Sequence, residues 1–417
     1  MSTSSRKAAI DVAPNRPPCF VLGVETQIGV GVIRELGRAG VRVIGLANRK
    51  HSIGLSSRYL ERGIVVGPAR DDSLVSRIRE LGEEYGGAVL LAISETDLAW
   101  LITNRGEFGQ VKVVAPEAET FRRVLDKART LELAEEAGIR IPRTQAPKSI
   151  DEWQTACSAM RYPVVVKWAD PMLAMPQLRA HKIPLLKLEF AANALELQAI
   201  GNRFAPAGIW PLIQEYCPGR GLGQFFFMHK GEAVRRFQHL RIAEWPPEGG
   251  FSSVCDAVPL AQHRELQERS IALLKAIGWE GCAMVEYRLD DKTGEAALME
   301  VNGRFWGSFP LAVQAGAGFA TLSYYIQGQD EAPPPLQPLQ DVLRCRMVAT
   351  EVKRLVRILL QRKQIRDPFY EVRPAHEVWR FVSDFFRKDT CYYLYDRQDP
   401  GPLLADLRNY LLRPFRR

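Results

Sequence analysis

The sequence predicts a mixed α/β and α+β protein with an N-terminal parallel-sheet domain, a second domain with two sub-lobes and an appended C-terminal helical region. Short apolar runs alternate with helical stretches over residues 18–116, which is typical of a parallel sheet. Residues 117–332 mix helices with longer alternating strands, and helical periodicity returns over 341–417. The 417 residues also exceed the ~250 to 300 at which single cores stop growing, so several domains are expected.

The N-terminal domain is expected to follow a flexible tail at residues 1–17. An apolar run, a glycine-containing turn and a helix that ends at Gly40 predict a βαβ opening. The glycines of its first turn do not match the GxGxxG pattern, so dinucleotide binding is not expected. Its strands are expected at 19–24, 41–47, 88–95 and 111–116.

The second domain is expected to begin with a helix that Gly138 ends. A strand with the sequence PVVVKW follows a second helix, and two strands near 282–302 follow a third. Prolines at 333–340 predict a linker, because proline interrupts both helix and sheet.

The C-terminal region, residues 341–417, is basic and amphipathic. From Glu331 onward the chain has 17 Lys and Arg against 11 Asp and Glu, in a protein of net charge +8. Such helices can pack on the main body, which is the favoured reading, or lie against a membrane surface or a partner complex. Nucleic acid is not an expected partner.

The overall composition is that of an ordinary globular protein, with 46% hydrophobic and 25% charged residues. Seven cysteines lie scattered without a CxxC pair or a histidine cluster, so neither a zinc site nor a disulfide framework is predicted. No run approaches the ~18 apolar residues of a membrane span, and the first residues lack the apolar stretch of a secretory signal. A cytoplasmic location is therefore expected, whereas the oligomeric state cannot be predicted.

The stretch LMEVNGRFWGS, residues 298–308, places acidic and amide side chains on an otherwise apolar strand. In a hairpin that pairs Asp290 with Ala296, Glu286 lies directly opposite Glu300. Two opposed carboxylates destabilise a sheet unless a cation neutralises them. The alternative is an ordinary hairpin on which one of the two side chains faces solvent.

Asn302 shares the face of Glu300, because side chains alternate along a strand. Mg²⁺ typically takes one or two carboxylates together with water and phosphate oxygens. We therefore predict a magnesium site at Glu286, Glu300 and Asn302. Arg304 follows at once and places a permanent positive charge beside it.

Two further features suit a phosphorylated ligand. Lys167 ends an apolar strand, which is unfavourable unless an anion meets it, and a snorkelling surface lysine is the alternative. Arg235, His239 and Arg241 share one face of a predicted strand, which we assign to triphosphate and a substrate carboxylate. A solvated edge strand is the alternative for that segment.

The stretches MVEYRLD and LMEVNGRFWGS resemble the metal-binding strands of the ATP-grasp superfamily, which end in Glu and then in Glu-x-Asn-x-Arg. The order of the chain agrees, because these families place a pre-ATP-grasp domain first, then a lysine on a helix and a lysine on a strand. The resemblance covers roughly residues 18–330 and includes the carbamoyl-phosphate-synthase-like carboxylate-amine ligases.

The resemblance implies ATP and Mg²⁺ as cofactors and assigns roles to residues of this chain. Lys127, in LDKART, and Lys167 match the two phosphate-binding lysines, and Arg304 matches the catalytic arginine. The segment LIQEYCPGRG is similar to the adenine hinge. The cofactor-binding residues are then Lys127, Lys167, Gln214, Glu215, Tyr216, Cys217, His239 and Arg241, and the metal ligands are Glu286, Glu300 and Asn302.

The segment after Lys167 departs from the family pattern. It is usually a glycine-rich loop that covers the phosphates, but here it reads ADPMLAMPQLRAHKIPLLK. Without glycine the backbone approaches phosphates less freely. Arg179 or Lys182 can compensate through the side chain, or turnover is weakened or lost.

The expected function is an ATP-dependent carboxylate-amine ligase that acts on small-molecule substrates. It would activate a carboxylate as an acyl phosphate for attack by an amine. Two alternatives stay open. One is an ATP-grasp small-molecule kinase, and the other is a non-catalytic ATP-binding module whose basic tail docks on a membrane or a complex.

Overall fold

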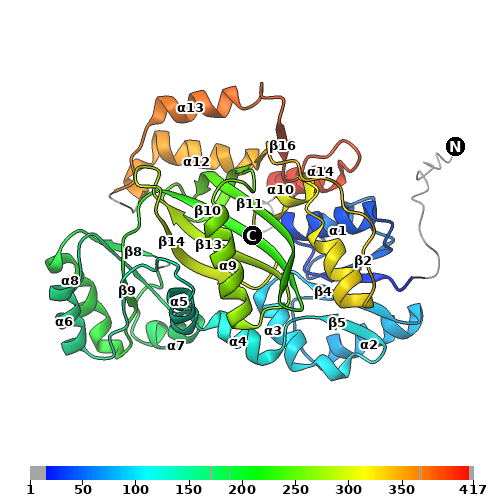
Figure 1. Ribbon diagram of the computed structural model, residues 1–417, viewed down its shortest axis with the longest axis horizontal. Coiled ribbons are helices and arrows are strands. Elements are labelled where there is room, and N and C mark those ends of the chain that lie inside the picture. Colours follow the sequence, from blue (N-terminus) through cyan, green and yellow to red (C-terminus); the bar gives the residue numbers. More distant parts are fainter. Residues whose placement is uncertain (1–15, 170, 187, 366, 368, 413–417) are drawn as a thin grey trace.

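The computed structural model describes residues 16–412 apart from 170, 187, 366 and 368, and the chain forms three sheets surrounded by helices (Figure 1). Nearly all of the tail expected at 1–17 lies outside the described residues. In Figure 1 a small lobe lies at the left, the N-terminal domain at the lower right, and a large sheet between them. The helices of the C-terminal region cover the top of that sheet.

The N-terminal domain is a five-stranded parallel sheet in the order β3-β2-β1-β4-β5. Phe20 and Leu22 of β1 pack into one hydrophobic core, and Cys19 and Val21 pack into another. Because both faces are buried, β1, β2 and β4 are continuously apolar, whereas the edge strand β3 is mostly exposed. Gly23, directly after β1, has a φ of 101° that favours glycine. The elements are β1 (Cys19–Leu22), α1 (Gln27–Arg38), β2 (Val43–Ala47), β3 (Arg62–Val65), α2 (Asp72–Tyr85), β4 (Ala88–Ala92), α3 (Glu95–Thr103) and β5 (Val111–Val114).

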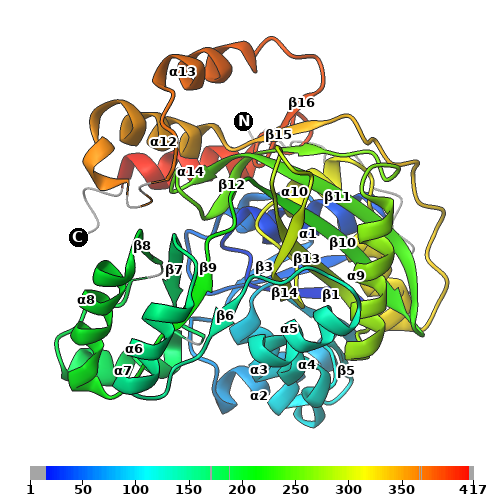
Figure 2. The ribbon, with the colours of Figure 1, turned by 60° about the vertical axis from the view of Figure 1, so that its left-hand side comes forward.

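A second sheet, with strand order β6-β9-β7-β8, forms the small lobe at the lower left of Figure 2. Trp153 is fully buried in its core, and its Nε1 donates a hydrogen bond to the Leu197 carbonyl at 3.0 Å. Gly201 lies against the same ring, where a Cβ would come within 2.1 Å of Nε1, so glycine permits this packing. The elements are α4 (Ala118–Leu125), α5 (Lys127–Glu136), β6 (Thr144–Gln145), α6 (Ile150–Ala159), β7 (Val164–Lys167), α7 (Pro171–Ala180), β8 (Glu189–Ala191), α8 (Ala194–Phe204) and β9 (Leu212–Glu215).

The large sheet has seven strands in the order β14-β13-β10-β11-β12-β15-β16. One face packs against helix α9, with Phe226 and Ile271 in a common core. The other face joins a second core, in which the Phe225 ring stacks on Trp306 with centroids 4.0 Å apart. The elements are β10 (Arg220–His229), β11 (Glu232–Trp245), β12 (Phe251–Ala257), α9 (Arg264–Ile277), β13 (Gly281–Leu289), β14 (Ala296–Asn302), α10 (Phe309–Gln314), α11 (Phe319–Leu322) and a π-helix (Ser323–Gln329).

The C-terminal region packs back on the main body. Besides the helices that its periodicity predicted, it adds two strands to the large sheet, each only three residues long. Arg346 of the first strand is fully buried and pairs with Glu351 at 2.8 Å. The elements are β15 (Arg344–Arg346), α12 (Val348–Leu360), α13 (Pro374–Ser383), β16 (Thr390–Tyr392) and α14 (Gly401–Leu412).

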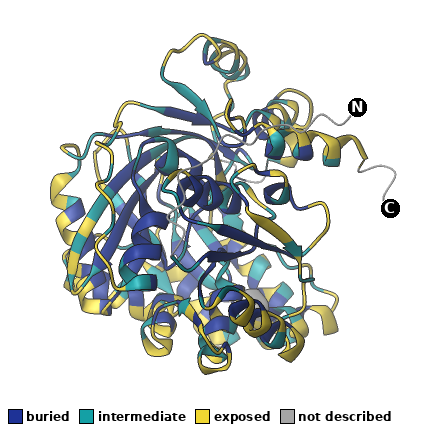
Figure 3. Ribbon diagram, turned by 90° about the vertical axis from the view of Figure 1, so that its right-hand side faces the viewer, coloured by how far each residue is buried: buried dark blue, intermediate teal, exposed yellow. Residues whose placement is uncertain are grey.

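The strands of the interior are buried, and the helices expose mainly their outward faces (Figure 3). No helix within residues 16–412, as far as they are described, is long and apolar enough to cross a bilayer.

Asp399 anchors the end of the C-terminal region on α1. Its carboxylate accepts hydrogen bonds from Arg34 Nε at 2.9 Å, Ser57 Oγ at 2.8 Å and the Arg58 backbone N–H at 2.8 Å. Both partners of the ion pair are almost inaccessible, at 2% and 1% exposure. Asp399→Ala leaves the Arg34 charge buried and unpaired, so we expect the free energy of unfolding to fall by about 3 to 5 kcal/mol in urea titrations.

A matched control removes an exposed ion pair of the same domain. Glu61→Ala breaks the contact of Glu61 with Arg42, which is 2.7 Å long and partly solvated. The expected change is below about 1 kcal/mol. Equal effects of the two substitutions would show that the Asp399 contact does not anchor the region.

Candidate active site

The hairpin of β13 and β14 places Glu286 directly opposite Glu300, so the predicted pairing is confirmed. The register assumed at the turn was wrong by one residue, because Ala296 does not pair with Asp290. An extra residue in β14, Met299, forms a bulge that restores the alignment. The two carboxylates therefore face each other as predicted, although the residue pairing at the turn differs by one position.

A chain of hydrogen bonds links the hairpin to the N-terminal domain. Asn302 Nδ2 donates to Glu300 Oε1 at 3.0 Å, and Arg304 Nη2 donates to Asn302 Oδ1 at 3.1 Å. Arg304 Nε in turn pairs with Glu95 Oε1 at 3.0 Å. Of the predicted metal ligands, Glu300 and Asn302 are thus in contact with Arg304, and Glu95 also holds the guanidinium. Glu286, the third predicted ligand, is bonded to Arg241 instead.

Sequence reasoning missed Glu95. It is the first residue of α3 and lies just beyond the carboxyl end of the parallel strand β4. Side chains at that edge commonly line ligand sites in α/β domains, and this position was the available signal.

A cavity of about 150 Å³ lies between α4, α5 and β14. Four of the predicted site residues line it together with Glu95. The four are Lys127, Glu300, Asn302 and Arg304.

The two predicted lysines lie near the same carboxylates. Lys127 is the first residue of α5, whose N-terminus Asp126 caps by accepting from Ala128 N at 3.0 Å. Lys167 ends β7, and its charge interacts with those of Lys127 and Glu300. Burial, followed by the positive charge of Lys127, lowers the pKa of Lys167 to about 8. An anion between the two ammonium groups would relieve this repulsion.

The two facing carboxylates differ in acidity. Burial, partly opposed by Arg241, raises the pKa of Glu286 above its ordinary value. Burial also favours the neutral form of Glu300, but the hydrogen bond from Asn302 and three neighbouring cations outweigh it and lower its pKa. Of the two side chains, Glu300 therefore ionises at lower pH than Glu286.

Arg241 is paired with carboxylates, contrary to its assignment as a free anion-binding group. Its Nη2 lies 2.6 Å from Glu286 Oε2, and its Nη1 lies 3.2 Å from Glu244 Oε1. Arg235, on the same strand face, donates instead to the carbonyls of Gly316 and Ala317. The alternation of residues along β11 predicted that Arg235 and Arg241 share a face of the strand, but it could not predict their bonding partners.

His239 is buried beside this pair. Its Nδ1 lies 3.1 Å from Ser308 Oγ, whereas its Nε2 has no partner among the described residues. Burial, followed by the charge of Arg241, holds its pKa well below 6.5, so the ring is neutral at physiological pH.

Arg241→Gln is expected to lower the free energy of unfolding by about 3 to 5 kcal/mol, because it leaves Glu286 buried without its cation. The double variant Arg241→Gln/Glu286→Gln should recover part of this loss, as measured by urea unfolding. Arg236→Gln, which breaks an exposed pair with Glu268, is the control and should change stability by less than about 1 kcal/mol. Additive effects in the double variant would refute the coupling.

Solved structures resemble the chain over most of its length, and three illustrate the range. The biotin carboxylase domain of 2-oxoglutarate carboxylase from Hydrogenobacter thermophilus has a TM-score of 0.59 at 16% identity, covering 78% of this chain and 72% of that one. An N5-carboxyaminoimidazole ribonucleotide synthetase has 0.58 at 13%, covering 79% and 81%. An L-amino acid ligase from Bacillus licheniformis has 0.54 at 15%, covering 75% and 74%.

A family model, the carbamoyl-phosphate synthase L chain ATP binding domain, matches residues 255–325, which contain the hairpin and Arg304. Together with the solved structures, this match shows that the chain has the ATP-grasp fold. No curated protein matches its sequence. The likeness to solved structures, at these identities, shows the fold of the chain.

The segment that we expect to be the adenine hinge is β9 with the two residues after it. Gln214 Nε2 donates to Thr144 Oγ1 at 2.9 Å, and Glu215 Oε1 accepts from Arg140 at 2.7 Å. Cys217 is buried, and its Sγ lies 3.7 Å from Arg140 Nη1. Gln214 and Glu215 thus have protein partners.

The C-terminal region reaches this hinge, which the sequence did not suggest. Tyr216 Oη donates to Asp367 Oδ2 at 3.2 Å, and the Tyr216 ring lies 5.1 Å from that of Phe369. Burial, followed by the charge of Asp367, raises the pKa of Tyr216 to about 12, so the hydroxyl stays protonated. Two segments some 150 residues apart in sequence therefore meet at the predicted adenine site.

The segment after Lys167, for which the family resemblance implied a glycine-rich loop, contains a helix, α7. Ala174 and Leu178 of this helix pack with Trp168 and Phe204 in a core of their own. A segment held by buried apolar contacts moves less readily than a glycine loop. The glycine-poor sequence after Lys167 thus corresponds to a packed helix.

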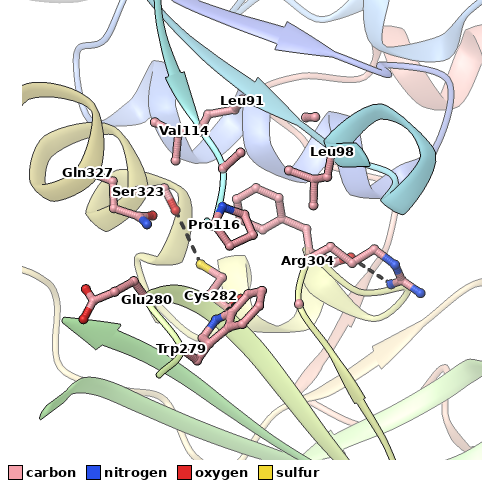
Figure 4. Close-up of a pocket in the computed structure, with 14 residues that line it drawn as sticks. Leu91, Leu98, Val114, Pro116, Trp279, Glu280, Cys282, Arg304, Ser323 and Gln327 are labelled. Atoms are coloured by element: carbon pink, nitrogen blue, oxygen red, sulfur yellow. Dashed lines mark hydrogen bonds between the residues drawn. The ribbon is translucent and has the colours of Figure 1, made fainter. Parts of the chain in front are cut away.

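Figure 4 shows a second cavity, on the side of Arg304 that faces the N-terminal domain. It has a volume of about 40 Å³ and is lined mainly by apolar side chains, among them Leu91, Val114 and Trp279. This space holds a few water molecules at most and is too small for a nucleotide. The cavity at Glu300 is the better candidate for the active site, because four of the predicted site residues line it.

Proposed function

We propose that the chain is an ATP- and Mg²⁺-dependent ligase that activates a substrate carboxylate as an acyl phosphate for attack by an amine. The observation that carries this proposal is the cluster of Glu300, Asn302, Arg304 and Lys127 around one cavity. The fold relatives support it. One is bound to MgADP and bicarbonate, one to ADP, and one is named an amino acid ligase.

The donor set of the hairpin fits Mg²⁺. Glu300 offers a carboxylate and Asn302 an amide oxygen, and Mg²⁺ prefers oxygen ligands. Glu286 offers a second carboxylate, which a metal would share with Arg241. In the part of the chain that the structure describes, no group of three or more His, Cys, Asp or Glu could hold a metal by itself. Phosphate and water would complete the coordination, as is common for this ion. When bound, Mg²⁺ would neutralise charge on the phosphates.

The remaining residues would hold the nucleotide. Lys127 and Lys167 present two ammonium groups near the carboxylates, which suits the phosphates. The backbone of the hinge, residues 214–217, would take the adenine, as in the family that the sequence resembles. His239 of β11 would contribute its Nε2, which has no partner among the described residues, whereas Arg241 would act through Glu286, with which it is paired.

In the proposed reaction a carboxylate oxygen of the substrate bonds to the γ-phosphorus, and the bond from that phosphorus to the β–γ bridging oxygen breaks to release ADP. The amine then bonds to the acyl carbon, phosphate leaves and the nitrogen loses a proton. Arg304 would stabilise charge on the transferred group. Its contacts with Glu95 and Asn302 fix the guanidinium in advance, which favours such a role.

The test is a screen of ADP release with pooled amino acids, small organic acids and polyamines, followed by mass spectrometry of the products. An amide, ADP and free phosphate support the ligase. A stable phosphorylated metabolite would show a kinase instead.

A non-catalytic ATP-binding module is the second candidate, and helix α7 favours it. If its packed core at Ala174 and Leu178 prevents closure over the phosphates, Mg-ATP should bind without turnover. Calorimetric titration with Mg-ATP, combined with the absence of ADP release across the whole panel, would support this candidate.

The pKa of Lys167 predicts a pH dependence of nucleotide binding. Above pH 8 the free protein loses the ammonium charge, so the affinity for Mg-ATP should fall by up to about tenfold per pH unit. Titrations with a fluorescent nucleotide between about pH 7 and 9.5 measure this. Lys167→Met should bind weakly at every pH. A flat profile for the unaltered protein would contradict the assignment of Lys167 to phosphate.

A further inference from the structure

Exposed apolar side chains concentrate in the C-terminal region. Most of the exposed large apolar side chains among the described residues lie beyond residue 341, on and around α12, α13 and α14. On α13 and just after it, Trp379 is 70% and Phe386 83% exposed. Large exposed apolar patches mark interaction surfaces. The α13 face, as we name it, consists of Val378, Trp379, Val382 and Phe386.

The opposite side of α13 is fixed to the body of the protein. Glu377 Oε1 accepts from Arg354 Nη2 at 2.7 Å, and the Arg346 guanidinium lies 5.3 Å from the centre of the Phe381 ring. Arg354 and Glu377 are largely buried, and Arg346 is fully buried. These contacts fix the inner side of α13, and the helix itself lies at the top of the molecule in Figure 1.

The two neighbouring helices expose similar stripes. Helix α12 contacts α14 through Lys353, whose Nζ lies 4.9 Å from the centre of the Tyr410 ring. The spacing on each helix puts the exposed residues on one face. They are Val352, Val356, Leu359 and Leu360 on α12, and Leu404, Leu407 and Leu411 on α14.

The charge of this region is strongly positive. Residues 341–417 contain 17 Lys and Arg against 10 Asp and Glu, which accounts for nearly all of the net charge of +8. Arg362, Lys363 and Lys388 are exposed, and within the described residues none of them forms an ion pair. Basic side chains beside exposed aromatic ones are typical of helices that lie in the interface of an anionic bilayer.

We infer that the C-terminal region docks peripherally on an anionic phospholipid surface, with the α13 face in the headgroup layer. Tryptophan and phenylalanine suit that layer, and the surrounding cations suit its charge. No helix within the described residues could span a bilayer, so the contact is peripheral. A second copy of the chain fits less well, because two such faces would bring like charges together.

The test uses the full chain and vesicles of equimolar phosphatidylglycerol and phosphatidylcholine, with pure phosphatidylcholine vesicles for comparison. The protein should sediment with the anionic vesicles and stay in solution with the neutral ones. The double variant Trp379→Ser/Phe386→Ser should weaken binding to anionic vesicles by at least about tenfold. Lys363→Glu and Lys388→Glu should each weaken it by about fivefold or more, and high salt should act in the same direction.

Leu195→Ser is the matched control, because Leu195 of α8 is 78% exposed but lies on the small lobe. This variant should bind vesicles as the unaltered protein does. Thermal unfolding of each variant checks that folding is unchanged.

Three outcomes would overturn the inference. They are equal binding to neutral and anionic vesicles, vesicle binding that survives all of these substitutions, and a dimer that Trp379→Ser/Phe386→Ser dissociates while no vesicle binding occurs. The last outcome can be measured by light scattering, and it would show that the α13 face is an interface between two copies of the chain. Each outcome is independent of ATP hydrolysis and therefore separable from failure of the proposed function.

Discussion

Glu300→Gln is expected to lower Mg²⁺-dependent turnover of ATP by at least about 100-fold. The amide keeps the size of the side chain but removes a negative charge that faces Glu286 and interacts with Lys127, Lys167 and Arg304. The carboxylate is the better anion of the hairpin because its pKa is lowered, so its loss should remove most of the affinity for the cation.

A binding measurement makes this prediction independent of the substrate. In the unaltered protein Mg²⁺ should strengthen ATP binding, and in Glu300→Gln this effect should disappear. Glu265→Gln, on the exposed side of α9, is the control and should leave both quantities unchanged. If Glu300→Gln retains the Mg²⁺ effect, the hairpin does not hold the metal.

Lys167→Met is expected to have two opposite effects. Affinity for Mg-ATP should fall by at least about 30-fold, because a charge-assisted contact with phosphate is lost. The free energy of unfolding at pH 7 should rise by about 2 kcal/mol, because the folded pKa of about 8 lies below the usual 10.5. A pKa lowered in this way means that the buried charge opposes folding at neutral pH.

The sign of the pH dependence separates this effect from ordinary packing. Between about pH 8 and 10.5 the unfolded chain keeps the proton that folded Lys167 releases, so the stability of the unaltered protein should rise through this range. The gain of Lys167→Met should therefore shrink from pH 7 to pH 9.5 in urea titrations. Lys112→Met, on an exposed position of β5, is the control. A gain that is constant with pH would refute the lowered pKa.

Periodicity predicted the parts of the fold that are regular and local. The inner strands β1, β2 and β4 of the N-terminal sheet are buried on both faces, which leaves continuous apolar runs in the sequence, whereas the exposed edge strand β3 has no such run and was not predicted. Alternation along the hairpin predicted that Glu286 faces Glu300, and the bulge at Met299 compensated the error in the turn. The predicted site residues near Glu300 therefore came together without knowledge of the exact register.

Contacts between distant segments could not be read from local patterns. The partners of Arg241 and Arg235, and the contact of Tyr216 with Asp367, depend on the packing of whole elements.

The cysteines show the same limit. Cys255, Cys345 and Cys391 are scattered in the sequence, yet they occupy neighbouring positions on three adjacent strands. Strands of three residues are too short to show a period, so this ladder has no signature in the sequence.

The hydrogen bond between Tyr216 and Asp367 ties the predicted adenine site to the region that we expect on lipid. A nucleotide that changes the free energy of this contact would be coupled to any ligand of the C-terminal region that also changes it. By reciprocity, a surface that reorders the C-terminal segment would shift nucleotide affinity by an equal factor. Comparing nucleotide dissociation constants with and without anionic vesicles measures this thermodynamic linkage directly.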